Sequence, residues 1–228
     1  MPTKRINKYL RDQGIASRRE ADELVESGEI FINGVVAELG SLVNDADIVE
    51  VKRKSEKRYE YRAYYKPRGL ATQSETEEDV VSLWEPRGLY PIGRLDKESE
   101  GLLILTNDGR LTTLLLGAES ETEKEYVVRV REELRDTVVQ VFQKGMDTEA
   151  LGTLLPAYAE VVDTHTLNVT LVEGKKHQIR VMLSDLGYTV ESLKRVRVGP
   201  VSLDTLTPSK DRALTKEEIS ALGLPPTR

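Results

Sequence analysis

Apolar residues recur with regular spacing along the first fifty residues of the chain. Within residues 5–12 and again within residues 17–28 they fall on one face of a helix, and Ser17 with Glu20 forms the pattern of a capping box at the second helix start. Asn33-Gly34 is a favourable two-residue hairpin turn. The apolar runs around it predict three short strands: Ile30–Ile32, Val35–Val36 and Ile48–Val51. The pattern therefore predicts a compact α+β unit.

After a charged segment that is almost free of apolar residues, the hydrophobic pattern alternates between strand and helix spacing. The expected strands are Tyr61–Tyr65, Leu102–Thr106, Tyr126–Val130, Leu167–Leu171 and Val196–Val201. The expected helices cover residues 79–84, 110–116, 134–142, 179–186 and 215–222. Tight turns between these elements favour antiparallel pairing. We therefore expect an α+β fold, with an antiparallel or mixed sheet flanked by helices.

The charged segment also indicates how the chain is divided. Because residues 52–60 are almost free of apolar positions, they are typical of an extended linker rather than of a packed element. We expect a small N-terminal domain over residues 1–52, a charged linker over 53–60 and a larger domain over 61–228.

Composition narrows the class of protein. The chain has 228 residues, no cysteine and two histidines, which excludes disulfides, thiolate nucleophiles and cysteine- or histidine-rich metal sites. No apolar run approaches the roughly 20 residues that a membrane span needs. The basic N-terminus is not followed by an apolar secretion segment. We expect a cytoplasmic protein that does not enter a membrane.

Charge is unevenly distributed along the chain. The formal net charge is −6 at pH 7, but basic side chains cluster within residues 1–19, 52–58 and 175–197. A protein that is acidic on average can still present a basic face to nucleic acid. Ordinary solvated surface charge is the alternative interpretation of each cluster.

The stretch Gly93–Gly109 carries the strongest candidate chemistry. Arg94 and Asp96 lie two residues apart in a glycine-flanked loop that leads directly into the apolar strand Leu102–Thr106. Asn107-Asp108-Gly109 is a turn signal that ends this strand. A carboxylate on a loop braced by a buried strand is held in fixed geometry, as a reactive acid must be. An ordinary aspartate in a turn is the competing interpretation.

The same stretch resembles the signature of a known enzyme family. Gly-Arg-Leu-Asp, then Ser99, then Gly-Leu-Leu-Ile-Leu-Thr-Asn-Asp-Gly is similar to the motif of the RsuA family of pseudouridine synthases, which modify ribosomal RNA. Residues 4–51 resemble the S-four-type RNA-binding domain. In that domain the basic first helix and the start of the second contact RNA, and both cations and a helix N-terminus attract phosphate. The resemblance implies RNA contacts by Lys4, Arg5, Lys8, Arg18 and Arg19.

The resemblance implies one reaction, the isomerisation of uridine to pseudouridine in a flipped nucleotide. The bond from the sugar to nitrogen-1 of uracil breaks, the base turns, and a new bond forms to carbon-5. Since no oxidation state changes and no group is donated, neither a cofactor nor a metal is required. Asp96 is the implied carboxylate at the sugar, acting as nucleophile or as base, and both roles stay open. A long central sheet with the active-site cleft across it is implied as well.

Further matched positions complete the implied site. Arg180 corresponds to an arginine that pairs with the catalytic aspartate, and such a cation keeps a buried carboxyl ionised. Tyr126 corresponds to a tyrosine that stacks on the target base. Arg94 is implied to occupy the space of the flipped nucleotide or to hold phosphate, and Leu193 to pack the floor of the site.

Three neighbouring positions are less well matched. The family more often has arginine where Lys175 stands and a second basic residue where Val181 stands, which puts local phosphate contacts in doubt. His177 is interpreted as a structural or RNA-contacting residue rather than as an acid or base.

Two alternative functions fit parts of the pattern. A catalytically idle RNA-binding or ribosome-assembly factor on the same scaffold should have lost Asp96, Tyr126 or Arg180, and all three are present. A two-carboxylate glycoside hydrolase needs a second acid facing the same cleft, and the sequence locates none. We expect ribosomal RNA or a pre-ribosomal particle as the partner and a monomeric protein. The sequence does not identify the target uridine, nor the ribosomal RNA that carries it.

Overall fold

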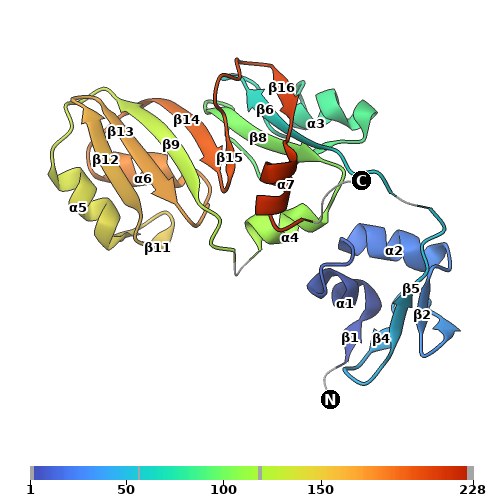
Figure 1. Cartoon of the computed structure of the whole chain (residues 1–228). Coiled ribbons are helices and arrows are strands. Elements are labelled where there is room, and N and C mark those ends of the chain that lie inside the picture. Colours follow the sequence, from blue (N-terminus) through green and yellow to red (C-terminus); the bar gives the residue numbers. More distant parts are fainter. Residues whose placement is uncertain (1–2, 56, 118–119, 225–228) are drawn as a thin grey trace.

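The first fifty residues form a unit with its own core, called here the N-terminal unit. In the computed structural model, residues 3–55, 57–117 and 120–224 are described. Two helices, α1 (Ile6–Asp12) and α2 (Arg18–Glu26), pack against small strands at one end of the molecule (Figure 1). The core that they share with the strands is built around buried aliphatic side chains, including Leu10 and Ile30. The predicted α+β unit is confirmed.

The strands of the N-terminal unit follow the predicted hairpin. They are β1 (Lys4–Arg5), β2 (Ile30–Ile32), β3 (Val35–Val36), β4 (Leu42–Val43) and β5 (Val49–Val51). β2 pairs with β3 and β5, and the turn residues Asn33 and Gly34 have φ values of 51° and 81°, as a tight hairpin requires. The pattern missed the pair of β1 with β4, because two-residue strands carry no periodicity.

A nine-stranded sheet organises the rest of the chain, called here the main unit. Its order is β12-β13-β9-β14-β8-β6-β16, with β15 beside β14 and β7 beside β8. The strands are β6 (Tyr61–Lys66), β7 (Tyr90–Ile92), β8 (Glu100–Thr106), β9 (Lys124–Val130), β12 (Tyr158–Asp163), β13 (Thr166–Leu171), β14 (Val190–Val198), β15 (Val201–Ser202) and β16 (Asp211–Ala213). A separate hairpin joins β10 (Met146–Thr148) and β11 (Gly152–Leu154). β8 and β14 are parallel while their other pairings are antiparallel, so the sheet is mixed.

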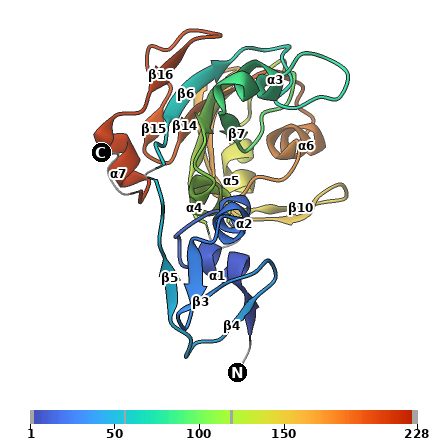
Figure 2. The same cartoon turned by 90° about the vertical axis from the view of Figure 1, so that its right-hand side faces the viewer.

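Helices cover both faces of this sheet. They are α3 (Val80–Trp84), the 3-10 helix η1 (Glu85–Arg87), α4 (Arg110–Leu116), α5 (Thr137–Lys144), α6 (Gln178–Asp185) and α7 (Lys216–Ala221). Figure 2 shows α6 and α7 on opposite sides of the sheet. β8 is covered by α4 and α7 on one face and by α3 on the other, which explains its continuous apolar run. Every helix in the described part of the chain is too short or too polar to cross a membrane.

Two hydrophobic cores meet where β8 runs beside β14. One core lies around β6 and β8, and the other lies around β9, β12 and β13. Gly101 of β8 has a φ of 109°, and a Cβ atom added there would lie 2.2 Å from the carbonyl oxygen of Arg195. The close approach of the two strands therefore requires glycine at this position.

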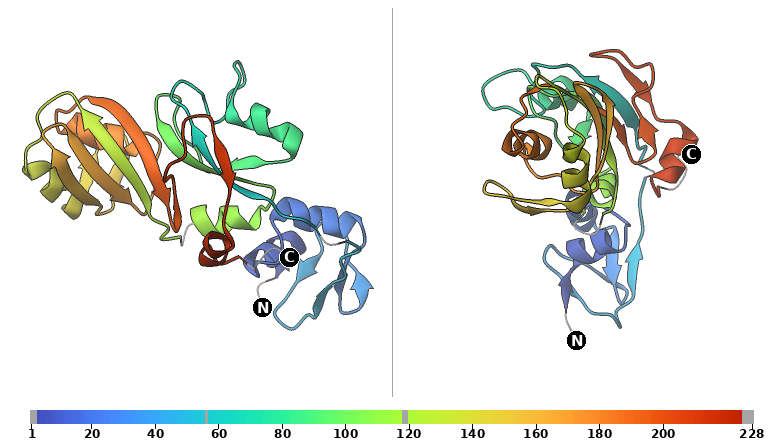
Figure 3. Two further views of the ribbon diagram at one scale, coloured as in Figure 1. Left: turned by 45° about the horizontal axis from the view of Figure 1, so that its top comes forward. Right: turned by 90° about the vertical axis from the view of Figure 1, so that its left-hand side faces the viewer.

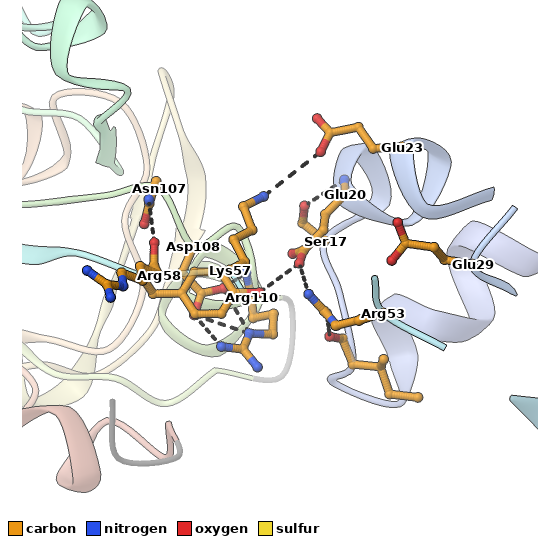
Figure 4. Close-up of polar contacts among 12 residues, drawn as sticks. Ser17, Glu20, Glu23, Glu29, Arg53, Lys57, Arg58, Asn107, Asp108 and Arg110 are labelled. Atoms are coloured by element: carbon orange, nitrogen blue, oxygen red, sulfur yellow. Dashed lines mark hydrogen bonds and ion pairs between the residues drawn. The ribbon is translucent and has the colours of Figure 1, made fainter. Parts of the chain in front are cut away.

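The N-terminal unit contacts the main unit beside α4, as Figures 1 and 3 show. Ser17 caps α2 by accepting from the Glu20 amide, as predicted. The capping-box role of the Glu20 carboxylate is wrong, because the carboxylate turns away from the helix start. It accepts from Arg53 Nη1 at 2.9 Å and from the Tyr59 hydroxyl at 2.7 Å instead (Figure 4). Glu20 thus anchors the charged segment that follows β5.

The other side of this contact is a buried aspartate at the end of β8. Asp108 accepts from the Tyr61 hydroxyl at 2.5 Å. It also accepts from Arg110 Nη2 at 2.7 Å (Figure 4). The Arg110 guanidinium lies 4.5 Å from the centre of the Tyr59 ring. A Cβ atom at Gly109 would lie 2.3 Å from the Cβ atom of Ser17, so the two units are in close contact there.

Candidate active site

The loop that carries Asp96 lies between β7 and β8 and is fixed on both sides of the aspartate. The buried Thr72 donates from its hydroxyl to the carbonyl oxygen of Leu95 at 2.7 Å and accepts from the Leu95 amide at 2.9 Å. On the other side, the Gly69 amide donates to the carbonyl oxygen of Lys97 at 2.8 Å. Because the segment after β6 holds the main chain before and after Asp96, the carboxylate is presented in a defined direction.

A cavity of about 910 Å³ opens beside Asp96. It is lined by the Asp96 loop, by β9, by the segment that leads into α6, and by β14. Small-molecule sites commonly have volumes of about 300–1,000 Å³, so a single extruded nucleotide has a suitable space here. Four of the predicted site residues line it together: Arg94, Asp96, Tyr126 and Leu193.

The sheet places Tyr126 and Leu193 on the wall of this cavity. Tyr126 on β9 is the cross-strand partner of Arg195 on β14, and such partners project from the same face of a sheet. Leu193 lies two residues before Arg195 on the same strand and therefore shares that face. Leu193 is buried while Tyr126 is half-buried, which leaves a tyrosine ring accessible from the cavity.

Arg180 lies behind the Asp96 loop rather than in the cavity wall. Its Nη2 donates to the carbonyl oxygen of Glu98 at 3.1 Å and to Ser99 Oγ at 3.2 Å. Burial lowers the pKa of Arg180, and the negative charge of Asp96 opposes that change. The direct ion pair with Asp96 that the resemblance implies is not formed among the described residues, and Arg180 contacts the loop that follows Asp96 instead.

His177 contacts Asp96 directly. Its Nε2 lies 3.2 Å from Asp96 Oδ1. The residue immediately precedes α6 and has a φ of 57°, in the left-handed region that histidine visits more often than most non-glycine residues. No signal in the sequence marks this contact, because the two residues belong to distant segments.

A buried lysine lies close to the same loop. Lys66, at the end of β6, is fully buried and donates from Nζ to the carbonyl oxygens of Pro67 at 2.9 Å and Leu70 at 2.6 Å. Burial lowers the pKa of Lys66 to about 8, although Asp96 and nearby glutamates favour its charged form.

The predicted RNA-contacting side chains lie on the N-terminal unit, outside the cavity. All of them are exposed to solvent: Lys4, Arg5, Lys8, Arg18 and Arg19. Arg18 and Arg19 are the first two residues of α2, at the positive end of its dipole. The structure therefore separates these cations from the Asp96 cavity and leaves them accessible to phosphate.

Comparison with known proteins identifies both parts of the chain. Residues 60–185 match the family model described as RNA pseudouridylate synthase, and residues 4–49 match the model of the S4 domain. The dual-specificity RNA pseudouridine synthase RluF of Escherichia coli (strain K12) is 35% identical over 226 residues, which cover 94% of this chain and 77% of that protein. Ribosomal large subunit pseudouridine synthase B of Bacillus subtilis (strain 168) is 35% identical over 232 residues, or 96% of this chain and 95% of that protein.

A solved structure extends the similarity to the fold. The crystal structure of a pseudouridylate synthase superposes with a TM-score of 0.72 and 25% sequence identity, covering 96% of this chain and 99% of that one. The two resemblances drawn from the sequence are thereby confirmed. The family model spans more than half of the chain, and the relatives extend over nearly all of it. This chain therefore belongs to the RNA pseudouridylate synthase family.

Proposed function

We propose that this protein isomerises a specific uridine of ribosomal RNA to pseudouridine. Family membership supports the reaction, and the similarity to a ribosomal large subunit pseudouridine synthase along nearly its whole length supports the substrate. The observation that carries the proposal is the position of Asp96, held by main-chain bonds at the edge of a nucleotide-sized cavity that also presents Tyr126.

The side chains around the cavity have separate roles in this proposal. Asp96 acts at the ribose, as nucleophile or as base, while Tyr126 stacks on the extruded uracil. Leu193 packs the floor beneath the base. Arg94, exposed at the cavity, fills the space that the nucleotide leaves or holds a phosphate. Arg180 fixes the loop after Asp96 and favours its ionised form.

RNA binding is assigned to the N-terminal part of the chain. We propose an RNA-binding domain over residues 1–52, a linker over 53–60 and a catalytic domain over 61–228, because the N-terminal unit has its own core and exposes its cations. The protein acts as a monomer on ribosomal RNA or on a pre-ribosomal particle, and the cytoplasm is the proposed location because the substrate is there.

Incubation of the purified protein with ribosomal RNA tests this proposal. Pseudouridines are mapped chemically before and after the reaction, without any added cofactor and with a chelator in a parallel sample. We expect one uridine position to be converted in both samples. Tight RNA binding without conversion at any position would contradict the proposal and support the idle RNA-binding factor instead.

A further inference from the structure

Two buried cations on the wall of the Asp96 cavity have no acidic partner among the residues that the structure describes. Arg195 on β14 is 6% exposed and Lys124 on β9 is 7% exposed, and both line the cavity together with Asp96 and Tyr126. Buried charges in proteins are normally paired, because an unpaired charge loses its hydration without compensation. Within residues 3–55, 57–117 and 120–224, neither cation forms an ion pair with a carboxylate.

The hydrogen bonds of these two side chains leave donors unused. Arg195 donates from Nε to the carbonyl oxygen of Leu102 at 2.8 Å, which fixes the guanidinium plane. Its terminal nitrogens have no hydrogen-bond partner in the part of the chain that the structure describes. Lys124 donates from Nζ to the carbonyl oxygen of Val172 at 3.1 Å. An ammonium has three donors and a guanidinium five, so both side chains retain donors for a ligand.

Arg197, which lies on the same strand as Arg195, is paired with carboxylates, as is usual for an arginine. Arg197 donates from Nε to Glu125 and from Nη2 to Glu123, each at 2.9 Å. These carboxylates raise the pKa of Arg197, whereas burial and the charge of Arg195 lower the pKa of Lys124. Among the described residues, Arg195 and Lys124 thus differ from Arg197 in having no carboxylate bonded to them.

The position of Arg195 relative to the reacting base follows from the sheet. Arg195 is the cross-strand partner of Tyr126, the residue proposed to stack on the uracil, and Leu193 on the same face packs the floor. A uracil held against Tyr126 therefore lies beside the guanidinium. The bond to the sugar, by contrast, faces the Asp96 loop.

The charge balance of the reaction explains why a cation is needed there. Before the bond between the ribose and nitrogen-1 breaks, uridine is neutral and Asp96 is negative. If Asp96 bonds to carbon-1 of the ribose, or if it takes a proton from the ribose, it becomes neutral in either case. The electron pair of the broken bond to nitrogen-1 stays on the detached base, so the negative charge moves from Asp96 to the uracil and spreads over its two carbonyl oxygens.

We propose that Arg195, with Lys124 beside it, stabilises the uracil anion that forms when the bond to the sugar breaks. This rests on the proposed function. When the electron pair of the anion forms the bond from carbon-5 to carbon-1 of the ribose, either the ester bond to Asp96 breaks and returns its electron pair to the carboxylate, or Asp96 returns its proton to the ribose. The proton on carbon-5 then leaves to solvent and nitrogen-1 takes one up, which restores the aromatic base. Both side chains are buried and held by main-chain carbonyl oxygens before the reaction, and donors fixed in this way are effective in stabilising developing charge. Arg195 is thus assigned as a catalytic residue that contacts the leaving group.

Single-turnover kinetics with two substrates test this assignment. Arg195→Gln is compared with wild type on the target RNA fragment containing uridine or 5-fluorouridine, and loss of the original nucleoside is measured after digestion. Since fluorine already stabilises the uracil anion, the loss of rate should be on the order of 10²–10³-fold with uridine and clearly smaller with 5-fluorouridine. RNA affinity should change less than about twofold.

Matched variants separate this role from a structural one. Arg197→Gln, which removes a carboxylate-paired arginine outside the cavity, should leave both rates unchanged. Lys124→Gln should lose less of the single-turnover rate than Arg195→Gln does, and its loss should again be smaller with 5-fluorouridine than with uridine. Arg195→Lys should recover part of the rate that Arg195→Gln loses. A loss of rate in Arg195→Gln that is equal on the two substrates, or a loss confined to RNA affinity, would overturn the assignment. A wild-type protein that converts neither substrate would instead reject the proposed function.

Discussion

The two sets of cations in this molecule differ in what surrounds them. The five cations of the N-terminal unit that are proposed to contact RNA are exposed to water, whereas three cations near Asp96 are buried: Lys66, Lys124 and Arg195. An exposed cation costs little to maintain and attracts any phosphate, mainly by releasing counterions. A buried cation without a carboxylate lowers stability, so its presence needs a reason in what the cavity binds. Affinity for RNA and chemistry on one base are therefore assigned to different regions, and variants can separate them.

The largest effect should come from the acid itself. Asp96→Asn removes the carboxylate that attacks the sugar or takes a proton from it, while the shape of the loop is kept. We expect the single-turnover rate to fall by at least about 10⁴-fold, the scale on which loss of such a group acts. The dissociation constant for the RNA should stay within about twofold, because the exposed cations are untouched. Turnover retained in this variant would reject the role of Asp96.

Removal of residues 1–55 should have the opposite effect to Asp96→Asn, because it should weaken RNA binding while the cavity is kept. The shortened chain keeps the Asp96 cavity but lacks all five exposed cations of the N-terminal unit. We expect RNA affinity at physiological salt to fall by about 10²-fold, since several cations that neutralise phosphates are removed together. Circular dichroism should show that the main unit keeps its secondary structure. Equal affinity of the full-length and shortened proteins would contradict the assignment of RNA binding to this part of the chain.

Arg110, which is partly buried and paired with a buried carboxylate, sharpens the comparison. Asp108 is fully buried and bonded to Arg110 and Tyr61. Asp108→Asn should lower the free energy of unfolding by roughly 3 kcal/mol, as expected when one partner of a buried pair is removed. The turnover of the folded fraction should not change. Urea unfolding combined with single-turnover kinetics measures both quantities, and a loss of turnover without a loss of stability would contradict this role.

The same pair predicts a dependence of stability on pH. Burial acts to raise the pKa of Asp108, but the hydrogen bonds from Arg110 and Tyr61 outweigh it and hold the pKa below its ordinary value. An aspartate with a lowered pKa stabilises the folded state fully above its unfolded pKa of about 3.9 and loses this contribution as the pH falls through the folded pKa. Between neutral pH and pH 3, wild type should therefore lose more stability than Asp108→Asn.

The smallest effect concerns the start of α2. Arg18 and Arg19 are exposed at the positive end of this helix. Replacing both with glutamine should reduce the slope of log affinity against log salt by about 1.8, since each phosphate that a cation neutralises on helical nucleic acid adds about 0.9 to the slope. Affinity should fall several-fold at low salt and turnover at saturating RNA should be unchanged. An unchanged slope would show that these two side chains do not bind phosphate.

Much of the fold was predictable from local patterns. The apolar run of β8, the hairpin at Asn33-Gly34 and the helix α7 all lie where the sequence indicated. The missed elements include β12 and β16, whose side chains are largely polar or exposed. Such strands are held by main-chain bonds to a neighbour, which leave no periodic signal in side chains. β14 also begins earlier than predicted, at Val190, because its first half is polar.

The site was predictable only where a motif marked it. The resemblance led to Asp96, Tyr126 and Leu193, and the structure brings them to one cavity. Arg195 belonged to a basic cluster that resembles surface charge in sequence, and only the register of β14 against β9 reveals that it is buried beside Tyr126. The contact of His177 with Asp96 likewise depends on tertiary structure.

One measurement tests the central claim most directly, namely that the Asp96 cavity modifies ribosomal RNA. Pseudouridines are mapped in ribosomal RNA from cells that make the wild-type protein and from otherwise identical cells that make Asp96→Asn at the same level. We predict that a specific uridine is modified in the first cells and unmodified in the second. Identical maps in the two cell lines would contradict the account.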